Sequence, residues 1–167
     1  ICSLFNTVSG KKITFLGWAF KKDTNDTRES AAIYVAEHLI EDGAEIHVYD
    51  PKVSEEKIKA DMLCLWELKG LSEEKIKSKL NQISVYKTAI DALNQAHAAA
   101  ILTEWDEFKT YDWESIYNNM YKPAFLFDGR NILDFKKLAA IGFQVKGIGK
   151  NNSFSAKLKV ENELVIR

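Results

Sequence analysis

The sequence predicts an α/β fold, a doubly wound and mainly parallel six-stranded Rossmann-like sheet with helices on both faces. Short apolar runs typical of buried strands alternate about six times with segments of helical periodicity, which is the pattern of such folds. The first of these runs ends in a polar connection of about nine residues, 18–26, whereas about two to six residues are typical. Ligands of open α/β sheets bind where strands end, so residues 18–26 are the first candidate for a functional segment.

The composition is that of an ordinary soluble domain. The 167 residues are enough for one hydrophobic core, and 46% of them are hydrophobic and 28% charged. A net charge of -1 gives no overall attraction to nucleic acid or to an anionic membrane. The longest apolar run, around residues 96–102, is far shorter than the roughly 18 residues of a membrane span. We therefore expect a cytoplasmic protein with neither a nucleic-acid nor a membrane partner.

The cysteines and histidines suggest no catalytic chemistry. Cys2 and Cys64 form neither a C-x-x-C pair nor a zinc-binding pattern, which fits a reducing compartment. We expect Cys64 to be a small buried thiol, because its neighbours are apolar. His38, His47 and His97 are scattered over separate elements, and each is expected to be structural. The sequence therefore predicts no catalytic residue and no metal site.

Capping signals after the long loop predict where the first helix begins. Asp26 followed by Glu29 has the spacing of a capping box. This spacing predicts a helix start near Thr27, with Arg28 in the first turn. The free N–H groups of that turn, the helix dipole and Arg28 would then all favour a nearby anion.

The charges and the glycine of this region indicate how an anion could be held. Lys21 and Lys22 add positive charge to the same loop, although paired loop lysines are equally well explained as solvated surface charge. Gly17 is the only glycine of residues 11–30, and no G-x-G-x-x-G motif is present there. Any phosphate bound here would therefore be held by side chains and not by a backbone cradle.

The remaining elements follow from apolar periodicity and from capping and turn residues. Residues 53–80 alternate acidic and basic side chains, which indicates exposed helix. The chain divides into residues 1–10, the end of a preceding linker, residues 11–150, the Rossmann-like domain, and residues 151–167, a tail. Within the domain we expect helices over 30–42, within 53–80 with a start at Ser72, over 88–95, from 112 onward and up to Leu138, and strands over 13–17, 44–50, 83–86, 98–102, 124–127 and 143–148.

Asp50 closes the second predicted strand and is followed by Pro51. An acidic residue at this position binds a ribose hydroxyl in dinucleotide folds. An Asp-Pro turn explains the same residue equally well. Both interpretations stay open on the sequence alone.

The usual strand order of this fold, 3-2-1-4-5-6, predicts a crevice between the carboxyl ends of the first and fourth strands and their neighbours. Three segments are then expected to meet there, namely residues 20–21, 103–105 and 128–130. Two cations, an aromatic ring and a carboxylate around one crevice suit a phosphorylated ligand that carries a flat base. Arg130 is either a ligand of that phosphate or the ion-pair partner of Asp128 or Glu104.

Four motifs at these positions occur in the same order in a known family. They are residues 20–30 (FKKDTNDTRES), 49–52 (YDPK), 103–105 (TEW) and 127–130 (FDGR). With these motifs the chain resembles the C-terminal UDP-binding domain of the UDP-glucose/GDP-mannose dehydrogenase family, over roughly residues 3–149. The resemblance implies an enzyme that oxidises UDP-glucose to UDP-glucuronate, a polysaccharide precursor, in two successive hydride transfers to NAD.

The resemblance also implies roles for individual residues. Phe20 and Lys21 are expected to contact the nucleotide sugar, Arg130 to reach the substrate from a neighbouring strand, and Arg28 to touch NAD across a domain interface. Residues 3–6 resemble a stretch that contributes to assembly, which implies a homo-oligomer between dimer and hexamer. The family's catalytic cysteine and its G-x-G-x-x-G domain precede the matching region, so the chain alone is expected to be inactive.

Departures from the family pattern leave alternatives for the substrate. Asn131 stands where animal members often have a second arginine, and residues 62–79 give no clear alignment with the family. Sister enzymes that act on GDP-mannose or on UDP-N-acetyl sugars share part of the motif set. A non-catalytic nucleotide-binding or oligomer-assembly module is the alternative from another functional class.

Overall fold

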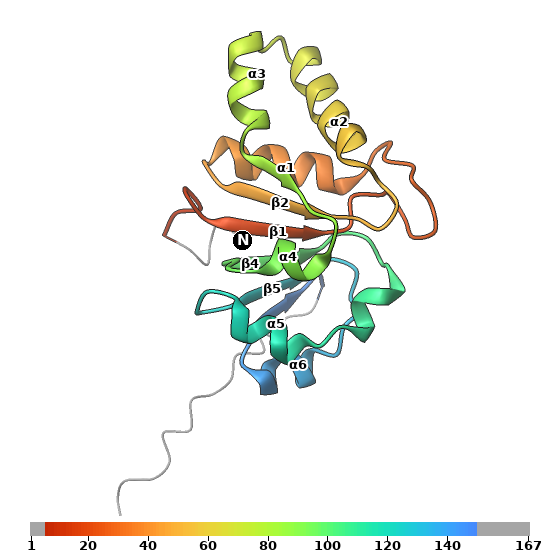
Figure 1. Cartoon of the computed structure of the whole chain (residues 1–167), viewed down its shortest axis with the longest axis vertical. Coiled ribbons are helices and arrows are strands. Elements are labelled where there is room, and N and C mark those ends of the chain that lie inside the picture. Colours follow the sequence, from red (N-terminus) through yellow and green to blue (C-terminus); the bar gives the residue numbers. More distant parts are fainter. Residues whose placement is uncertain (1–5, 150–167) are drawn as a thin grey trace, which may run out of the picture.

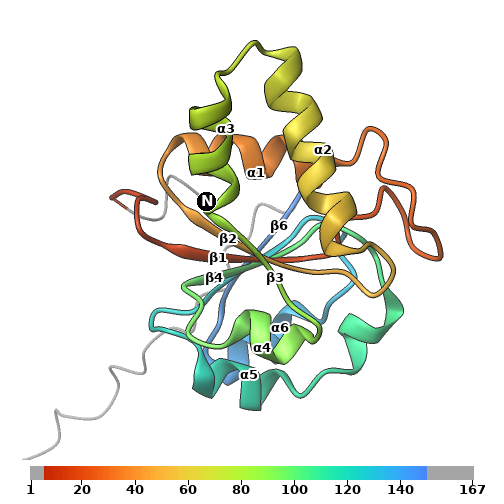
Figure 2. The same cartoon turned by 45° about the horizontal axis from the view of Figure 1, so that its top comes forward.

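A computed structural model describes residues 6–149 of the chain. The six strands form one parallel sheet in the order β3-β2-β1-β4-β5-β6, as the sequence predicts. Figures 1 and 2 show α1, α2 and α3 on one face of this sheet and α4, α5 and α6 on the other. The strands are β1 (Lys12–Leu16), β2 (Glu45–Tyr49), β3 (Ile83–Val85), β4 (Ala98–Ile101), β5 (Phe125–Asp128) and β6 (Gln144–Gly147). The helices are α1 (Ala31–Glu41), α2 (Glu55–Leu68), α3 (Glu73–Leu80), α4 (Ala89–Leu93), the 3₁₀ helix η2 (Asp106–Thr110), α5 (Trp113–Asn119) and α6 (Phe135–Ile141).

The two central strands are buried on both faces because helices cover the sheet on each side. Every residue of β4 is buried, and so is every residue of β1 except the first. The hydroxyl of Thr14, in the middle of β1, donates to the carbonyl oxygen of Ala92 at 2.6 Å. This hydrogen bond satisfies the one polar side chain within β1 that is fully buried.

The prediction that the first helix starts near Thr27 is wrong. The helix α1 begins at Ala31, and its N-cap is Ser30, whose hydroxyl accepts a hydrogen bond from the backbone N–H of Ala32 at 3.3 Å. The chain folds back before the helix, because the backbone N–H of Phe20 donates to the carbonyl oxygen of Asp26 at 2.8 Å. Arg28 therefore belongs to the loop and not to the first helical turn.

The charged segment 53–80 forms the helix pair α2 and α3, which stands above the sheet in Figure 1. Ser72 caps α3 as predicted, since its hydroxyl accepts from the backbone N–H of Lys75. The helix α2 nevertheless buries a stripe at helical spacing, made by Ile58, Met62 and Trp66. Cys64 lies outside this stripe and is exposed, so the prediction of a buried thiol is wrong.

Some predictions fall outside the described residues. These are the resemblance of residues 3–5 to an assembly segment, the position of Cys2 and the assignment of residues 151–167 as a tail. The domain boundaries therefore stay predictions, as does the cytoplasmic location. Among residues 6–149, no helix is long and apolar enough to cross a membrane.

Candidate nucleotide-binding site

The carboxyl ends of β1, β4 and β5, where the strand order predicts a crevice, lie side by side. Leu16 pairs with Ile101, which in turn pairs with Asp128. The loops that leave these strands touch at Gly17, where an added Cβ atom would lie 2.4 Å from the Cβ of Thr103. Gly17 also has a φ of 96°, so only glycine fits this junction.

The start of the loop after β1 is fixed by three side chains. The Asp50 carboxylate accepts hydrogen bonds from the backbone N–H groups of Trp18 at 2.7 Å and Ala19 at 3.0 Å. The hydroxyl of Thr103 donates to the carbonyl oxygen of Ala19, and the hydroxyl of Ser30 donates to that of Trp18. The backbone next to Phe20 is therefore held firmly although the loop is long.

Two of the predicted ligand residues stand on the exposed part of this loop. Phe20 is 48% exposed, so its ring is free to pack against a ligand. Lys21 is exposed and makes no hydrogen bond or ion pair with residues 6–149. Its charge is therefore available to an anion.

The neighbouring Lys22 is already engaged. Its ammonium group lies 2.7 Å from a carboxylate oxygen of Asp106, which also pairs with Lys109. The hydrogen bonds from Lys109 and Lys22 lower the pKa of Asp106 to about 2, so the carboxylate stays ionised. The structure thus distinguishes the two neighbouring lysines, because Lys22 is ion-paired with Asp106 and Lys21 is not.

Arg130 joins the three loops of the crevice. Its Nε donates to the carbonyl oxygen of Leu102 at 2.8 Å, and one Nη donates to that of Phe20 at 3.2 Å. Nε also lies 3.3 Å from Oε2 of Glu104, so the expected ion pair forms with Glu104. Asp128 instead accepts from the backbone N–H groups of Arg130 and Leu133. A guanidinium has five N–H donors, and these two hydrogen bonds leave others for a phosphate.

Arg28 is separate from this group. Its guanidinium makes a bidentate pair with Asp26, with Nε and Nη2 at 3.0 and 2.7 Å from the carboxylate oxygens. These hydrogen bonds hold the pKa of Asp26 below its usual range. The Arg28 side chain is 87% exposed. Within residues 6–149 its hydrogen bonds connect it to Asp26 and to none of the other predicted ligand residues.

The structure decides between the two interpretations of Asp50. Its carboxylate is buried and also accepts from the backbone N–H groups of Lys52 and Val53, as in the turn that an Asp-Pro pair predicts. A further donor is the indole Nε1 of Trp105 at 3.1 Å. With these donors the carboxylate has no position left for a ribose hydroxyl.

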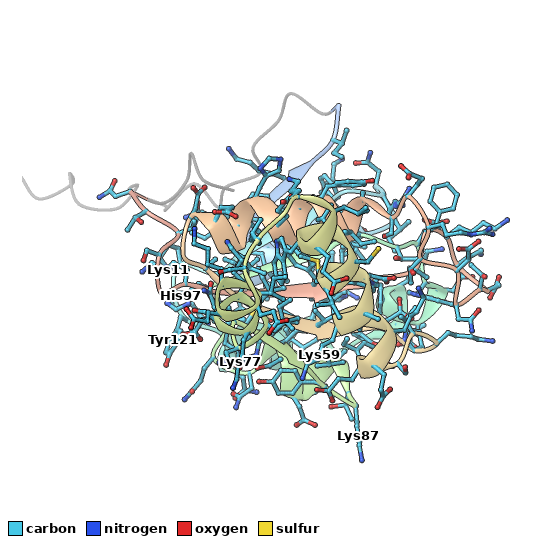
Figure 3. All side chains as sticks on the ribbon, turned by 90° about the horizontal axis from the view of Figure 1, so that it is seen from above. Lys11, Lys59, Lys77, Lys87, His97 and Tyr121 are labelled. Carbon is cyan, nitrogen blue, oxygen red and sulfur yellow. The ribbon has the colours of Figure 1, made fainter. Side chains whose placement is uncertain are left out.

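Two of the three histidines, His47 and His97, have structural surroundings. Nδ1 of His97 accepts from the backbone N–H of Lys12, and its ring packs on Tyr121 just before β4 begins. Figure 3 labels His97 and Tyr121 next to each other. His47 is buried in β2 and stacks on Tyr86, while His38 is exposed on α1. Among residues 6–149, no group of three or more His, Cys, Asp or Glu side chains could hold a metal ion.

Two hollows flank α5, with volumes of about 370 and 200 Å³. The larger lies between α5 and α6, and the smaller between α4 and α5. Neither is lined by the predicted ligand residues Phe20, Lys21, Arg28 and Arg130. The predicted ligand residues therefore lie outside these two hollows.

Sequence reasoning missed the anchoring role of Asp50, Thr103 and Ser30. Each is a polar residue at or just after the expected end of a strand or loop, where unpaired backbone groups need partners. That position is a usable signal. The identity of the backbone groups they bind depends on loops from different strands, which no local pattern reveals.

The doubly wound parallel sheet is that of α/β domains, a class that binds ligands at the carboxyl ends of its strands. Comparison with known families narrows this class. The family model described as "UDP-glucose/GDP-mannose dehydrogenase family, UDP binding domain" matches residues 14–135. The chain therefore belongs to the UDP-glucose/GDP-mannose dehydrogenase family.

Individual relatives agree with this assignment. UDP-glucose 6-dehydrogenase 3 of Oryza sativa subsp. japonica is 51% identical over 153 residues, which are 90% of this chain and 32% of the relative. UDP-glucose 6-dehydrogenase of Pongo abelii is 50% identical over 155 residues, 92% of this chain and 30% of the relative. The chain thus spans about a third of the length of the curated relatives it matches.

Known structures share the fold. A UDP-D-ManNAc dehydrogenase from Pyrococcus horikoshii is 28% identical with a TM-score of 0.63, over 89% of this chain and 28% of that one. An NDP-N-acetyl-D-galactosaminuronic acid dehydrogenase from Methanosarcina mazei Go1 superposes with a TM-score of 0.67 at 21% identity, over 89% of this chain and 26% of that one.

Proposed function

We propose that this chain is the UDP-sugar-binding part of an NAD-dependent UDP-glucose 6-dehydrogenase, which converts UDP-glucose to UDP-glucuronate by two successive hydride transfers. The observation that carries the proposal is the match to the family's UDP-binding domain, together with about 50% identity to UDP-glucose 6-dehydrogenases of plants and animals. The whole enzyme, its substrate and its partners are part of this proposal, because the chain spans about a third of those relatives.

In this proposal the diphosphate of the substrate lies between Lys21 and Arg130. Lys21 supplies a charge without a competing partner in residues 6–149, and Arg130 supplies N–H donors from a side chain that its carbonyl contacts already orient. Phe20 offers an exposed ring for apolar contact with the nucleotide sugar. The three groups are linked because Arg130 bonds the carbonyl oxygen of Phe20.

The described residues do not fit NAD as a principal ligand. The turn after β1 lacks the glycines of a dinucleotide cradle, and the Asp50 carboxylate is saturated by donors of the protein. NAD, which accepts the hydride when bound, is therefore assigned to the part of the enzyme outside this chain. Arg28, exposed on the outer loop, is the residue proposed to reach it across a domain interface.

The identity of the sugar has a second candidate. The structural relatives include dehydrogenases of N-acetylated nucleotide sugars, and one of them is 28% identical. A UDP-N-acetyl sugar would use the same diphosphate contacts, and GDP-mannose is the third candidate substrate of the family. Homo-oligomers between dimer and hexamer are proposed for the whole enzyme, and an assembly module without nucleotide affinity is the competing proposal.

Calorimetric titration of the chain with UDP, and with GDP as the control, tests the site. We expect saturable binding that prefers UDP, because the base and the diphosphate are both to be recognised. Lys21→Met should weaken UDP binding about three- to tenfold, whereas Lys22→Met should leave it nearly unchanged, because Lys22 is already neutralised by Asp106. Equal binding of UDP and GDP, or equal effects of the two substitutions, would contradict the assignment.

Two further measurements separate the competing proposals. Titration with UDP-glucose, a UDP-N-acetyl sugar and GDP-mannose ranks the candidate substrates. Sedimentation of the chain over a range of concentrations tests assembly. Oligomers that form without any nucleotide affinity would favour the assembly module.

A further inference from the structure

The carboxylate of Asp50 accepts an unusually large number of hydrogen bonds. It follows β2 and its side chain is 8% exposed. Oδ2 accepts from the backbone N–H groups of Trp18 and Ala19 and from the indole N–H of Trp105, at 2.7, 3.0 and 3.1 Å. Oδ1 accepts from the backbone N–H groups of Lys52 and Val53, at 2.8 and 3.0 Å.

These donors come from three loops that lie far apart in the sequence. Trp18 and Ala19 follow β1, Lys52 and Val53 follow β2, and Trp105 follows β4. One carboxylate therefore fixes the exits of three neighbouring strands relative to one another. Two of its donors directly precede Phe20, the first residue of the proposed ligand segment.

The backbone next to Phe20 depends on this carboxylate. Trp18 and Ala19 are both fully buried, so their N–H groups are removed from water. Both N–H groups have Asp50 as their acceptor. Losing it would leave two buried donors unpaired, and the loop would have to shift to satisfy them.

Only a carboxylate, with two accepting oxygens, can fill this role. An ionised Asp is acceptor-only, with about four lone-pair positions on its two oxygens, and here they face five donors. An asparagine of the same shape would place an NH₂ group against two or three of these N–H donors. Asp50→Asn is therefore a minimal change in volume that reverses the hydrogen-bonding sense of one oxygen.

We propose that Asp50 is a positioning residue that holds the loop bearing Phe20 and Lys21 in the shape that binds a uridine diphosphate group. The inference rests on the proposed UDP-sugar site. Asp50 itself touches no ligand, because its oxygens are occupied. It acts by raising the fraction of molecules whose loop is ready to bind, and the apparent affinity scales with that fraction.

The test compares Asp50→Asn with Thr14→Val. Thr14→Val removes the buried hydrogen bond to the carbonyl oxygen of Ala92 in the middle of β1, away from the crevice, so it destabilises the fold without changing the loop. We expect Asp50→Asn to weaken UDP binding about tenfold or more, and Thr14→Val to weaken it less than twofold, when both are measured well below their thermal midpoints. Equal UDP affinities in the two variants would overturn the inference.

A second readout does not depend on UDP. In ¹⁵N-resolved NMR spectra, Asp50→Asn should accelerate hydrogen exchange at the amides of Trp18 and Ala19 and shift the indole N–H resonance of Trp105. Thr14→Val should leave all three signals as they are. If the parent chain binds no UDP, the proposed function of the isolated chain fails, whereas the positioning role is judged by these signals alone. Unchanged exchange at both amides in Asp50→Asn would refute it.

A milder variant covers the case in which Asp50→Asn does not fold. Trp105→Phe removes one of the five donors and keeps the carboxylate and an aromatic ring. We expect a smaller but measurable rise in amide exchange at Trp18 and Ala19, with a loss of UDP affinity of about two- to fivefold. No change in either quantity would contradict a carboxylate that links the three loops.

Discussion

At the scale of single residues, Arg130 is the cation that the structure embeds most firmly in the crevice. Its side chain bonds two loop carbonyls and pairs with Glu104 while staying 33% exposed. We expect Arg130→Ala to weaken UDP binding about ten- to a hundredfold, because a hydrogen bond to a charged group contributes roughly 1.5–3 kcal/mol. Arg28→Ala is the matched control in the same calorimetric titration. If Arg130→Ala binds UDP as tightly as the parent chain does, the diphosphate lies elsewhere.

His47 gives the fold a dependence on pH. Burial, helped by the charge of Lys12, lowers the pKa of His47 to about 4, whereas an unfolded histidine titrates near pH 6.5. Between these values the unfolded chain binds a proton that the folded chain does not, so stability falls as the pH falls through this window, and levels off below it.

Urea unfolding between about pH 7 and 4 measures this effect. His47→Phe keeps an aromatic partner for Tyr86 and cannot titrate, so its stability should depend less steeply on pH over the same window. The comparison isolates His47 from His97, whose pKa is also lowered by burial. Parallel pH profiles for parent and variant would contradict the assignment.

At the scale of elements, the start of α1 is set by contacts of Ser30 and not by the local capping signal at Asp26. Ser30 bonds both the N–H of Ala32 and the carbonyl oxygen of Trp18, while Asp26 pairs with Arg28 on the surface. We expect Ser30→Ala to reduce the free energy of unfolding by about 1–2 kcal/mol and Asp26→Ala to reduce it by less, because Asp26 pairs with Arg28 in solvent. Urea unfolding of the two variants measures the difference. A larger loss of stability in Asp26→Ala than in Ser30→Ala would support the capping box at Asp26 instead.

The elements that the sequence predicts well share a simple physical signal. The strand β4 is a continuous apolar run and β1 a mostly apolar one, and both are buried on both faces. Ser72 with Glu73 and Glu74 marks the start of α3. The start of α1 could not be predicted in the same way. Asp26 and Glu29 have the spacing of a cap, but the backbone hydrogen bond from the N–H of Phe20 to the carbonyl oxygen of Asp26 closes that segment into a loop.

The candidate site was predictable to a similar extent. Strand order and motif positions bring Phe20, Lys21 and Arg130 to one edge, and Arg130 contacts Phe20 there. The difference between Lys21 and Lys22 was not predictable, because it depends on Asp106 in η2, more than 80 residues away. The exposure of Cys64 depends likewise on which stripe of α2 faces the sheet.

At the scale of the whole molecule, the chain should bind its ligand without turning it over. It spans about a third of its dehydrogenase relatives, and the proposed NAD site lies outside it. We expect no NADH from the chain with UDP-glucose and NAD, while saturating UDP should raise its thermal midpoint, since about hundredfold excess over Kd adds roughly 2.7 kcal/mol. Absorbance of NADH and thermal unfolding measure both quantities. NADH formation above the blank would contradict the proposal that the NAD site lies outside this chain.

The carbonyl contacts of Arg130 have a consequence for the speed of binding. A long flexible cation that had to be gathered by its ligand would lose up to about 2 kcal/mol of rotamer entropy on binding. Here the guanidinium is already tethered to the backbones of Leu102 and Phe20 in the free domain. A phosphate meets a fork that is fixed in advance, so association should proceed as a single docking step whose rate rises in proportion to ligand concentration without reaching a plateau.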